Sequence, residues 1–263
     1  MTYIKAVAIG FFAFSCLAVK AGGQSSPDHR ALFVEGISAD LGVGQYIGRD
    51  EVVSKNIYSG TLPYVAAHWA RFHTAYGYHV SLEYRQSSEI ANVGLPTEVT
   101  QLSMSRARLY PAGKLTLFPW DSYLYLGPST EFYLFFNQPR LEGEGLYLNF
   151  SFLALLSLGI SSDVVMPVTS SLRVEGRTRL ALLSFGLQMP DLQNTDEDSE
   201  PPIRLLNPFS CLHAAIDCGL RYQVSPSISL KMSYKLAVTR VTILRSLVTA
   251  SDNIMVSLSY HFW

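Results

Sequence analysis

Charged side chains that recur at every second position are the strongest candidates for chemistry in this chain. The segment 173–179 carries Arg, Glu, Arg and Arg at alternate positions, and period-two spacing places such side chains on one face of a strand. A cluster of this kind can attract anions or hold an acidic ligand, or it can form ion pairs that fill a narrow barrel, and we favour the filled interior. The expected interior cluster consists of Glu83, Arg85, Arg173, Glu175, Arg177, Arg179, Asp217, Arg221, Lys231 and Lys235.

The histidines offer no catalytic pair at the level of sequence. His213 and Asp217 share a strand face, but four residues of extended chain separate them by about 13 Å, beyond hydrogen-bond reach. His73 and His79 have one parity and His68 the other, so we expect them to be interfacial or interior histidines. The sequence has no G-x-S-x-G, H-E-x-x-H or P-loop motif. We therefore assign no catalytic residue and no cofactor.

The acidic segment 194–200 (NTDEDSE) has oxygen-bearing side chains at alternate positions, as the start of a calcium-binding loop does. Ser199 stands where such a loop needs glycine, and Leu205 stands where it needs a bidentate glutamate. We therefore expect a solvated acidic loop and no metal site. A weak divalent-ion contact that bridges lipopolysaccharide phosphates is the alternative.

Two cysteines lie close together in the C-terminal third. Cys211 and Cys218 are seven residues apart, so an extended strand puts them on opposite faces and more than about 20 Å apart. A disulfide requires its Cα atoms to lie within about 7 Å. We predict that the two thiols are not joined, and a Cys211–Cys218 disulfide would contradict a strand here.

These residues are positioned by segments in which polarity alternates with period two. Near the C-terminus, an apolar row from Ile254 to Phe262 opposes a polar row from Asn253 to His261. The segments 76–85, 212–223 and 227–238 show the same pattern. Helical spacing would mix the two rows, so we predict strands. The apolar stretch 146–160 is also assigned to a strand, with a short membrane helix as the alternative.

Ten strands are expected in all, near residues 32–43, 61–72, 76–87, 98–110, 122–137, 144–160, 168–187, 209–224, 226–240 and 252–263. The connections are mostly long on one side and mostly short on the other, with the segment 111–121 as the exception. This pattern is typical of a bacterial outer-membrane barrel. The expected fold is an all-β, antiparallel, up-and-down transmembrane barrel of ten strands, with eight or twelve as alternatives. The loops 44–60 and 188–208 are expected to carry any surface recognition.

The composition agrees with a membrane protein and excludes other classes. The chain has 263 residues, of which 48% are hydrophobic and only 16% charged, and its formal net charge is −1. It is too apolar for a disordered protein, and too neutral for a nucleic-acid partner that is bound through phosphate charge. Three cysteines are too few for a disulfide scaffold.

The N-terminus has the anatomy of a secretory signal peptide. Lys5 precedes an apolar stretch from Ala6 to Val19, and small residues follow at a cleavage site after Ala21. A short membrane anchor is the alternative, although the stretch is shorter than the ~20 residues that a spanning helix needs. We expect a signal peptide over 1–21, a flexible lead-in over 22–31, and a single barrel domain over 32–263.

Alternation alone does not say which face points inward. The polar rows contain many charges and the apolar rows almost none, as contact with lipid demands, because Lys or Arg on the lipid face costs roughly 2–4 kcal/mol at mid-depth. Aromatic residues gather at the strand ends, where the girdles of a membrane barrel lie. The expected girdle residues are Tyr76, Trp120, Tyr123, Phe135, Phe136, Tyr222, Tyr260, Phe262 and Trp263. A secreted soluble ligand-binding barrel, with its apolar face inward, is the alternative.

The last ten residues, IMVSLSYHFW, resemble the C-terminal signature of Gram-negative outer-membrane β-barrel proteins. The residues that carry the resemblance are Ile254, Val256, Leu258, Tyr260, Phe262 and Trp263. The resemblance implies an outer-membrane location and the barrel-assembly machinery as a transient partner. It does not identify a subfamily.

We therefore expect an integral outer-membrane barrel that contacts outer-membrane lipid and lipopolysaccharide and binds no nucleic acid. Its expected role is envelope structure, surface interaction or narrow, porin-like passive conductance through a charged and filled interior. An outer-membrane enzyme that hydrolyses lipid or peptide is the alternative from another class.

Overall fold

The computed structural model describes residues 35–51, 54–72, 76–92, 95–117, 120–139, 150–189, 203–243 and 245–262. The predicted signal peptide and lead-in, the acidic segment 194–200, His73 and Trp263 lie outside these residues. Within the described part, no helix is long and apolar enough to cross a membrane.

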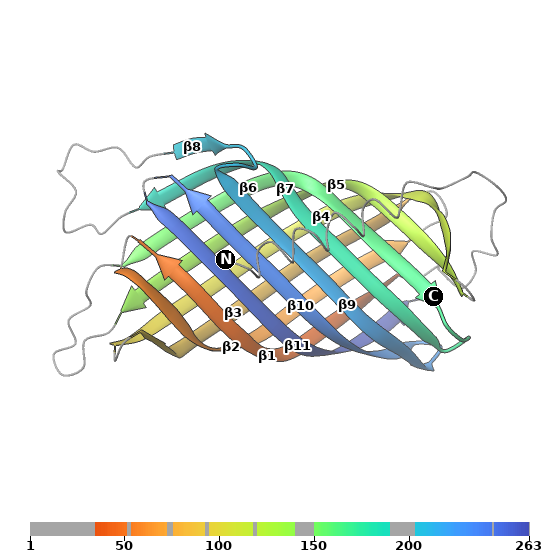
Figure 1. Ribbon diagram of the computed structural model, residues 1–263. Coiled ribbons are helices and arrows are strands. Elements are labelled where there is room, and N and C mark those ends of the chain that lie inside the picture. The colour runs from red at the N-terminus through yellow and green to blue at the C-terminus, as the bar shows by residue number, and fades with distance from the viewer. Residues whose placement is uncertain are drawn as a thin grey trace.

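The described chain folds into one closed antiparallel barrel (Figure 1). Its strands are β1 (Glu35–Asp50), β2 (Ser54–Phe72), β3 (Gly77–Asn92), β4 (Leu95–Leu117), β5 (Trp120–Pro139), β6 (Ser151–Pro167), β7 (Leu172–Met189), β8 (Ile203–Leu206), β9 (Cys211–Ser225), β10 (Ile228–Thr242) and β11 (Ser246–Phe262). Strand β1 pairs with both β2 and β11, and β6 pairs with β7, so ten strands form a ring while β8 adds only to β7. The predicted ten-stranded barrel is confirmed.

The barrel has two different ends. We call the end where β1 begins and β11 finishes the terminus end, and the opposite end, where β8 lies, the loop end (Figure 1). The described connections at the terminus end are short, as expected. The exception made for 111–121 was wrong, because residues 113–117 pair with residues 120–124 and extend the β4–β5 hairpin. A register shift between Pro111 and Gly113 hides the alternation there.

Two other predicted boundaries were wrong. Strand β6 ends at Pro167 and not at residue 160, because the polar row continues inward through Ser161 and Asp163, while the expected start at 144 lies outside the described residues. The expected long loop 44–60 is mostly strand, since β1 extends to Asp50 and β2 starts at Ser54. Strands that extend beyond the hydrocarbon region still pair with their neighbours, and this pairing satisfies the hydrogen bonds of their backbone N–H and C=O groups. The alternation of polar and apolar residues therefore does not mark where such strands end.

Strand β7 contains the main irregularity of the wall. Leu158 pairs with Leu183 but Gly159 pairs with Ala181, so Leu182 is an extra residue in a β-bulge. Alternation flips at this point, which explains why the period-two pattern blurs beyond Leu182 in the sequence. On its other side, β7 pairs with β9 up to Leu180 and with β8 from Ser184 onward.

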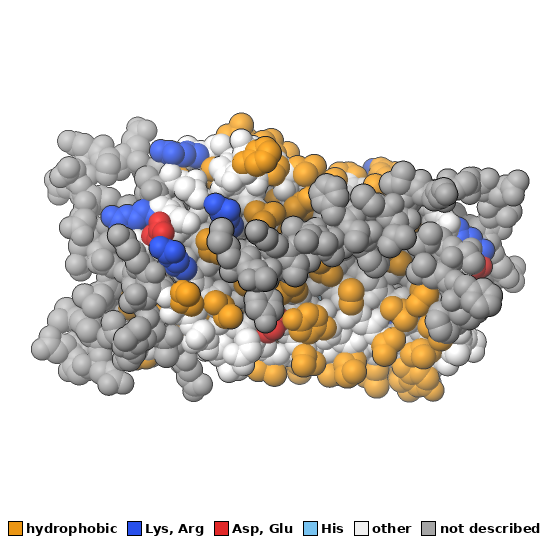
Figure 2. All heavy atoms as spheres, in the orientation of Figure 1, with side chains coloured by type: hydrophobic (Ala, Val, Ile, Leu, Met, Phe, Trp, Pro, Cys, Tyr) orange, Lys and Arg blue, Asp and Glu red, His pale blue; other side chains and the backbone are white. Residues whose placement is uncertain are grey.

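The wall has the polarity of a transmembrane barrel. In β11 the outward row from Ile254 to Phe262 is 46–63% exposed, whereas Ser257, Ser259 and His261 of the inward row are at most 5% exposed. Figure 2 shows hydrophobic side chains along this face, with most of the visible charged side chains toward the loop end. A soluble ligand-binding barrel would have its apolar row inward. The outward row here is the surface that hydrocarbon requires.

The interior changes character along the axis. At the loop end, an apolar cluster fills the barrel, formed by Tyr46, Tyr58, Leu62, Ile90, Val99, Tyr133, Phe135, Leu153, Leu155, Leu206, Cys211, Val241, Ile243 and Leu247. We call it the apolar layer. Phe135 is fully buried in it, so its assignment to an outer aromatic girdle was wrong. Between this layer and the terminus end the interior is mostly charged and polar, with two smaller apolar clusters, one formed by Tyr64, Ala66 and Met255 and the other by Ala107, Leu109 and Tyr125.

Candidate functional site: the charged interior

The ten residues of the expected interior cluster all come from strands of the ring and make their ion pairs inside it. They do not form one group. They lie in three tiers that follow one another along the barrel axis: the terminus-end tier, the second tier, and the middle tier, which borders the apolar layer. Side chains outside the expected cluster complete the second and middle tiers.

The terminus-end tier is organised around Glu175 on β7. Its carboxylate accepts two hydrogen bonds from Arg221 on β9, at 2.7 and 3.0 Å, and lies 2.7 Å from Nε of Arg173. Lys231 on β10 lies 4.0 Å from the same carboxylate and donates to Asp217 at 3.0 Å. One glutamate therefore faces three cations, because residues 173, 175, 221 and 231 face inward on adjacent strands.

The second tier spans the barrel from β6 to β1. Arg177 donates two hydrogen bonds to Asp163, at 2.8 and 2.6 Å, and its Nη1 lies 2.5 Å from Nε2 of His79. The rings of His79 and His68 stack at 5.5 Å, and His68 Nε2 lies 2.8 Å from Asp40 Oδ2. The opposite parity of His68 and His79 in sequence was misleading, because the turn between β2 and β3 resets the phase and both rings face inward.

The middle tier holds the most buried charges. Glu83 is 4% exposed and contacts Lys235, Arg179 at 2.7 Å and Arg85 at 3.4 Å. Glu131 on β5 lies 3.6 Å from Arg179 and accepts a 2.5 Å hydrogen bond from Ser103. Buried charges are tolerated only when they are paired and hydrogen-bonded, and here each carboxylate has at least two partners.

Sequence reasoning missed three residues of these tiers, Asp40, Glu131 and Asp163, whereas His68 and His79 were expected as interfacial or interior histidines and lie inside the ring. Asp40 and Glu131 lie at inward positions of expected strands, so their parity was a usable signal. Asp163 lay beyond the expected end of its strand. The pairings themselves depend on which strand faces which across the ring, and alternation carries no such information.

Among the described residues, side chains occupy most of the interior above the terminus end. The two deeper cavities measure about 20 Å³, beside Glu131 and His213, and about 10 Å³, beside His68 and His79. A water molecule needs about 10–15 Å³ in the same measure, so each deeper cavity holds one or two waters at most. The apolar layer then fills the loop end. Side chains therefore interrupt the interior before it reaches that end.

One arrangement in the middle tier has the order of a catalytic triad. Thr239 Oγ1 lies 2.8 Å from Nδ1 of His213, and Nε2 of His213 lies 3.2 Å from Glu131. Thr239 and His213 are buried, Glu131 is 12% exposed, and the adjoining cavity of about 20 Å³ has no room for a substrate. The arrangement therefore serves packing and charge pairing. His213 and Asp217, considered as a pair in the sequence, have separate partners.

The cysteines behave as predicted. Cys211 is buried against the Ser184 hydroxyl, at 3.6 Å, whereas Cys218 is exposed on the outer face, and both thiols are free. Their opposite faces follow from the seven-residue spacing in an extended strand.

The outer face at the terminus end carries aromatic and arginine side chains. The guanidinium of Arg106 lies over the ring of Tyr78 at 5.1 Å, and that of Arg108 lies 5.5 Å from both Tyr76 and Tyr110. Cations stacked on outward tyrosines suit the boundary between lipid and water, where an aromatic ring and a charge are both accommodated.

Comparisons with known proteins assign no family. No protein-family model matches the chain, and no curated protein matches it. Among solved structures, outer-membrane protease OmpT from Escherichia coli aligns with 92% of this chain and 99% of its own, at 11% identity and a TM-score of 0.48. Neisserial surface protein A aligns at 11% identity over 86% and 97% of the two chains, with a TM-score of 0.38.

The translocator domain of autotransporter NalP from Neisseria meningitidis aligns with 99% of this chain and 98% of its own, at 12% identity and a TM-score of 0.43. At these identities and scores, none of the likenesses carries an argument about the role of this chain. The site must therefore be interpreted from its own geometry.

Proposed function

We propose that the protein is an integral outer-membrane barrel with a closed interior, which serves envelope structure or surface interaction and does not conduct solutes. The observation that supports the closed interior is that three tiers of paired charges and an apolar layer follow one another along the inside of the ring. Ten strands are close to the size at which side chains alone fill a barrel. A narrow conductance would need a continuous aqueous path, and the apolar layer blocks it.

The location in the outer membrane is part of this proposal. It is supported by the apolar outer face, the inward charges and the short turns at the terminus end. Outer-membrane lipid and lipopolysaccharide are the surroundings we propose. Surface interaction falls to the loop end, where β8 exposes Ile203 and Leu205, and the following turn exposes Phe209 at 94%.

Assembly by the barrel-assembly machinery is proposed from the last strand. Tyr260 and Phe262 face outward with their rings 5.4 Å apart, in step with the apolar row behind them. We expect Phe262→Asp to slow insertion by the reconstituted machinery, whereas Ser227→Asp, in the β9–β10 turn, should not. Equal insertion rates for both variants would contradict the proposed role of the last strand in assembly.

Two measurements test the proposal as a whole. The folded protein in detergent should migrate differently on a gel before and after boiling, as closed membrane barrels do, and in planar bilayers it should show no channel steps. A soluble folded product without a migration shift would refute the membrane assignment. Stepwise conductance of folded protein would refute the closed interior while leaving the barrel intact.

A further inference from the structure

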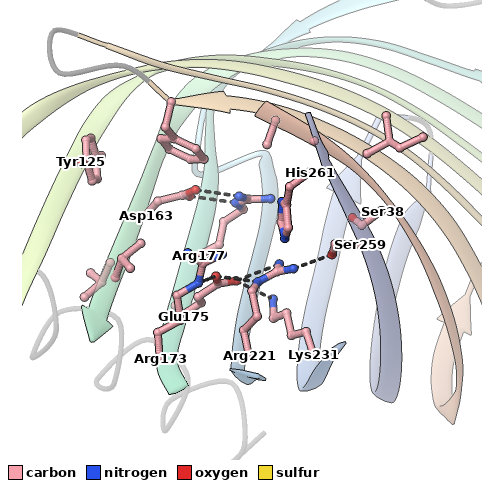
Figure 3. Close-up of a pocket in the computed structure, with 17 residues that line it drawn as sticks. Ser38, Tyr125, Asp163, Arg173, Glu175, Arg177, Arg221, Lys231, Ser259 and His261 are labelled. Carbon is pink, nitrogen blue, oxygen red and sulfur yellow. Dashed lines mark hydrogen bonds and ion pairs between the residues drawn. The ribbon is translucent and has the colours of Figure 1, made fainter. Parts of the chain in front are cut away.

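A cavity at the terminus end of the barrel plays no part in the closed-lumen proposal. Its volume is about 100 Å³, several times that of either deeper cavity described above. Figure 3 shows Arg173, Glu175, Arg177, Arg221 and Lys231 around it, together with His261 and Ser38. Because a water needs about 10–15 Å³ in this measure, the cavity has room for a small polyatomic ion.

The lining of this cavity is unbalanced in charge. Four cations line it, Arg173, Arg177, Arg221 and Lys231, against the two carboxylates Asp163 and Glu175. Lys231 has one further carboxylate partner, Asp217, which lies outside the lining. Counting Asp217, the four cations face three carboxylates, so the site carries a formal excess of one positive charge. An excess of this kind within a barrel wall favours a bound anion.

The donors that remain free are arginine N–H groups. Nε of Arg173 forms an ion pair with Glu175 at 2.7 Å, and the structure shows no hydrogen bond from its two Nη groups to the described residues, so these groups are free donors. Arg177 donates to Asp163 through Nε and Nη2 and its Nη1 contacts His79, which leaves one N–H on each Nη of a side chain that lines the cavity. Arg221, by contrast, has its donors committed to Glu175, Ser229 and Ser259.

Charge and geometry together select the ligand. Arginine donates paired N–H groups in a fork that fits the oxygens of phosphate and carboxylate. A phosphate monoester or inorganic phosphate carries between one and two negative charges at neutral pH, which balances the excess, and it offers at least three oxygens as acceptors to two arginines. A single carboxylate would balance the charge but has only two oxygens for the two arginines. The cavity is inside the ring, so the ligand must enter from the terminus end.

We propose that the terminus-end cavity is a binding site for a phosphate group, held chiefly by Arg173 and Arg177. Under the outer-membrane proposal the terminus end faces the periplasm, and the site would then take up free phosphate or a small phosphate ester from that side. The site itself requires only the folded barrel, so it stands or falls separately from the closed interior.

Calorimetric titration of the folded protein in zwitterionic detergent with inorganic phosphate tests the site. We expect saturable binding in phosphate that is absent in chloride of the same ionic strength. Arg173→Gln should weaken it at least tenfold, and Arg173→Lys should weaken it less. Arg71→Gln is the matched control, because Arg71 lies at the same end but on the outer face, where its only described partner is Glu35. The migration shift on a gel checks that each variant is folded.

A gain-of-charge variant covers the case in which Arg173→Gln does not fold. Ser38→Asp places a carboxylate against the cavity and removes no existing ion pair, so it should abolish phosphate binding in a folded barrel. Titration in phosphatidylcholine vesicles with and without phosphatidic acid distinguishes free phosphate from a lipid phosphate group as the ligand. If phosphatidic acid occupied the site, inorganic phosphate would bind more weakly in the vesicles that contain it. Binding that is absent up to millimolar phosphate, or unchanged in Ser38→Asp, would overturn the proposal.

Discussion

Glu83 is the residue whose replacement should cost the barrel most. Its carboxylate is 4% exposed and is the shared partner of Lys235, Arg179 and Arg85. Glu83→Gln keeps the shape of the side chain but leaves three buried cations around a neutral amide. Removing one partner of a buried ion pair typically costs about 3–5 kcal/mol, because the remaining charge is desolvated and uncompensated. We expect a loss of free energy of unfolding in this range.

The assay is reversible urea unfolding in lipid vesicles, followed by tryptophan fluorescence. Glu35→Gln is the matched control, because Glu35 pairs with Arg71 at 3.3 Å and both side chains are about 40% exposed. An exposed pair of this kind contributes about 0–1 kcal/mol. If Glu83→Gln and Glu35→Gln lowered the free energy of unfolding by the same small amount, the claim that the middle tier is a desolvated ion-pair network would be refuted.

A double variant sharpens the test of Glu83. Glu83→Gln combined with Lys235→Met removes one of the cations that Glu83→Gln leaves unpaired. The double variant should therefore regain part of the free energy of unfolding that Glu83→Gln loses. Residues within one network do not contribute additively, and this non-additivity is the expected signature. Additive losses in the double variant would mean that Lys235 is held mainly by other groups.

Three further outcomes follow from the wall. Gly44→Ala should impair folding, because a Cβ there would lie 1.5 Å from the Asp252 carbonyl oxygen on the paired strand β11. In the control Gly176→Ala the new Cβ meets nothing within 4 Å, so this variant should fold normally. Gel migration after refolding distinguishes the two variants. In vesicles, Cys218 should react with a membrane-permeant maleimide but not with a charged one, and Cys211 with neither, as mass spectrometry will show. Deletion of Leu182 removes only the bulge residue and restores strict alternation, so this variant should still insert; failure to insert would show that the wall needs the bulge.

The fold was largely predictable because lipid imposes one simple rule on every strand. Each spanning residue faces either hydrocarbon or the interior, so polarity alternates, as in Ile254–Phe262 against Asn253–His261. The rule stops working where lipid contact ends or the backbone departs from regularity. The hairpin beyond Pro111, the end of β6 and the bulge at Leu182 are such places, and they are where the predicted boundaries or phases failed.

The candidate site was predictable as a set of charges but not as a structure. Parity alone places Glu83 and Arg179 on inward faces. It cannot place them 2.7 Å apart, because β3 and β7 meet across the lumen and not as neighbours in the wall. Phe135 illustrates the opposite error. An aromatic residue near a strand end fits a girdle, but its inward phase puts it in the apolar layer.

The axial asymmetry of the interior limits what each end of the molecule can do. Toward the loop end the apolar layer fills the ring, while the outer surface carries exposed polar side chains (Gln45, Gln86 and Arg240) beside exposed apolar ones (Ile47 and Leu205). A surface of this mixed polarity can face water or a partner. At the terminus end the interior is charged and hollow. Under the closed-interior proposal, small ions reach the charged interior from the terminus end, and a partner at the loop end would contact exposed side chains such as Ile203, Leu205 and Phe209.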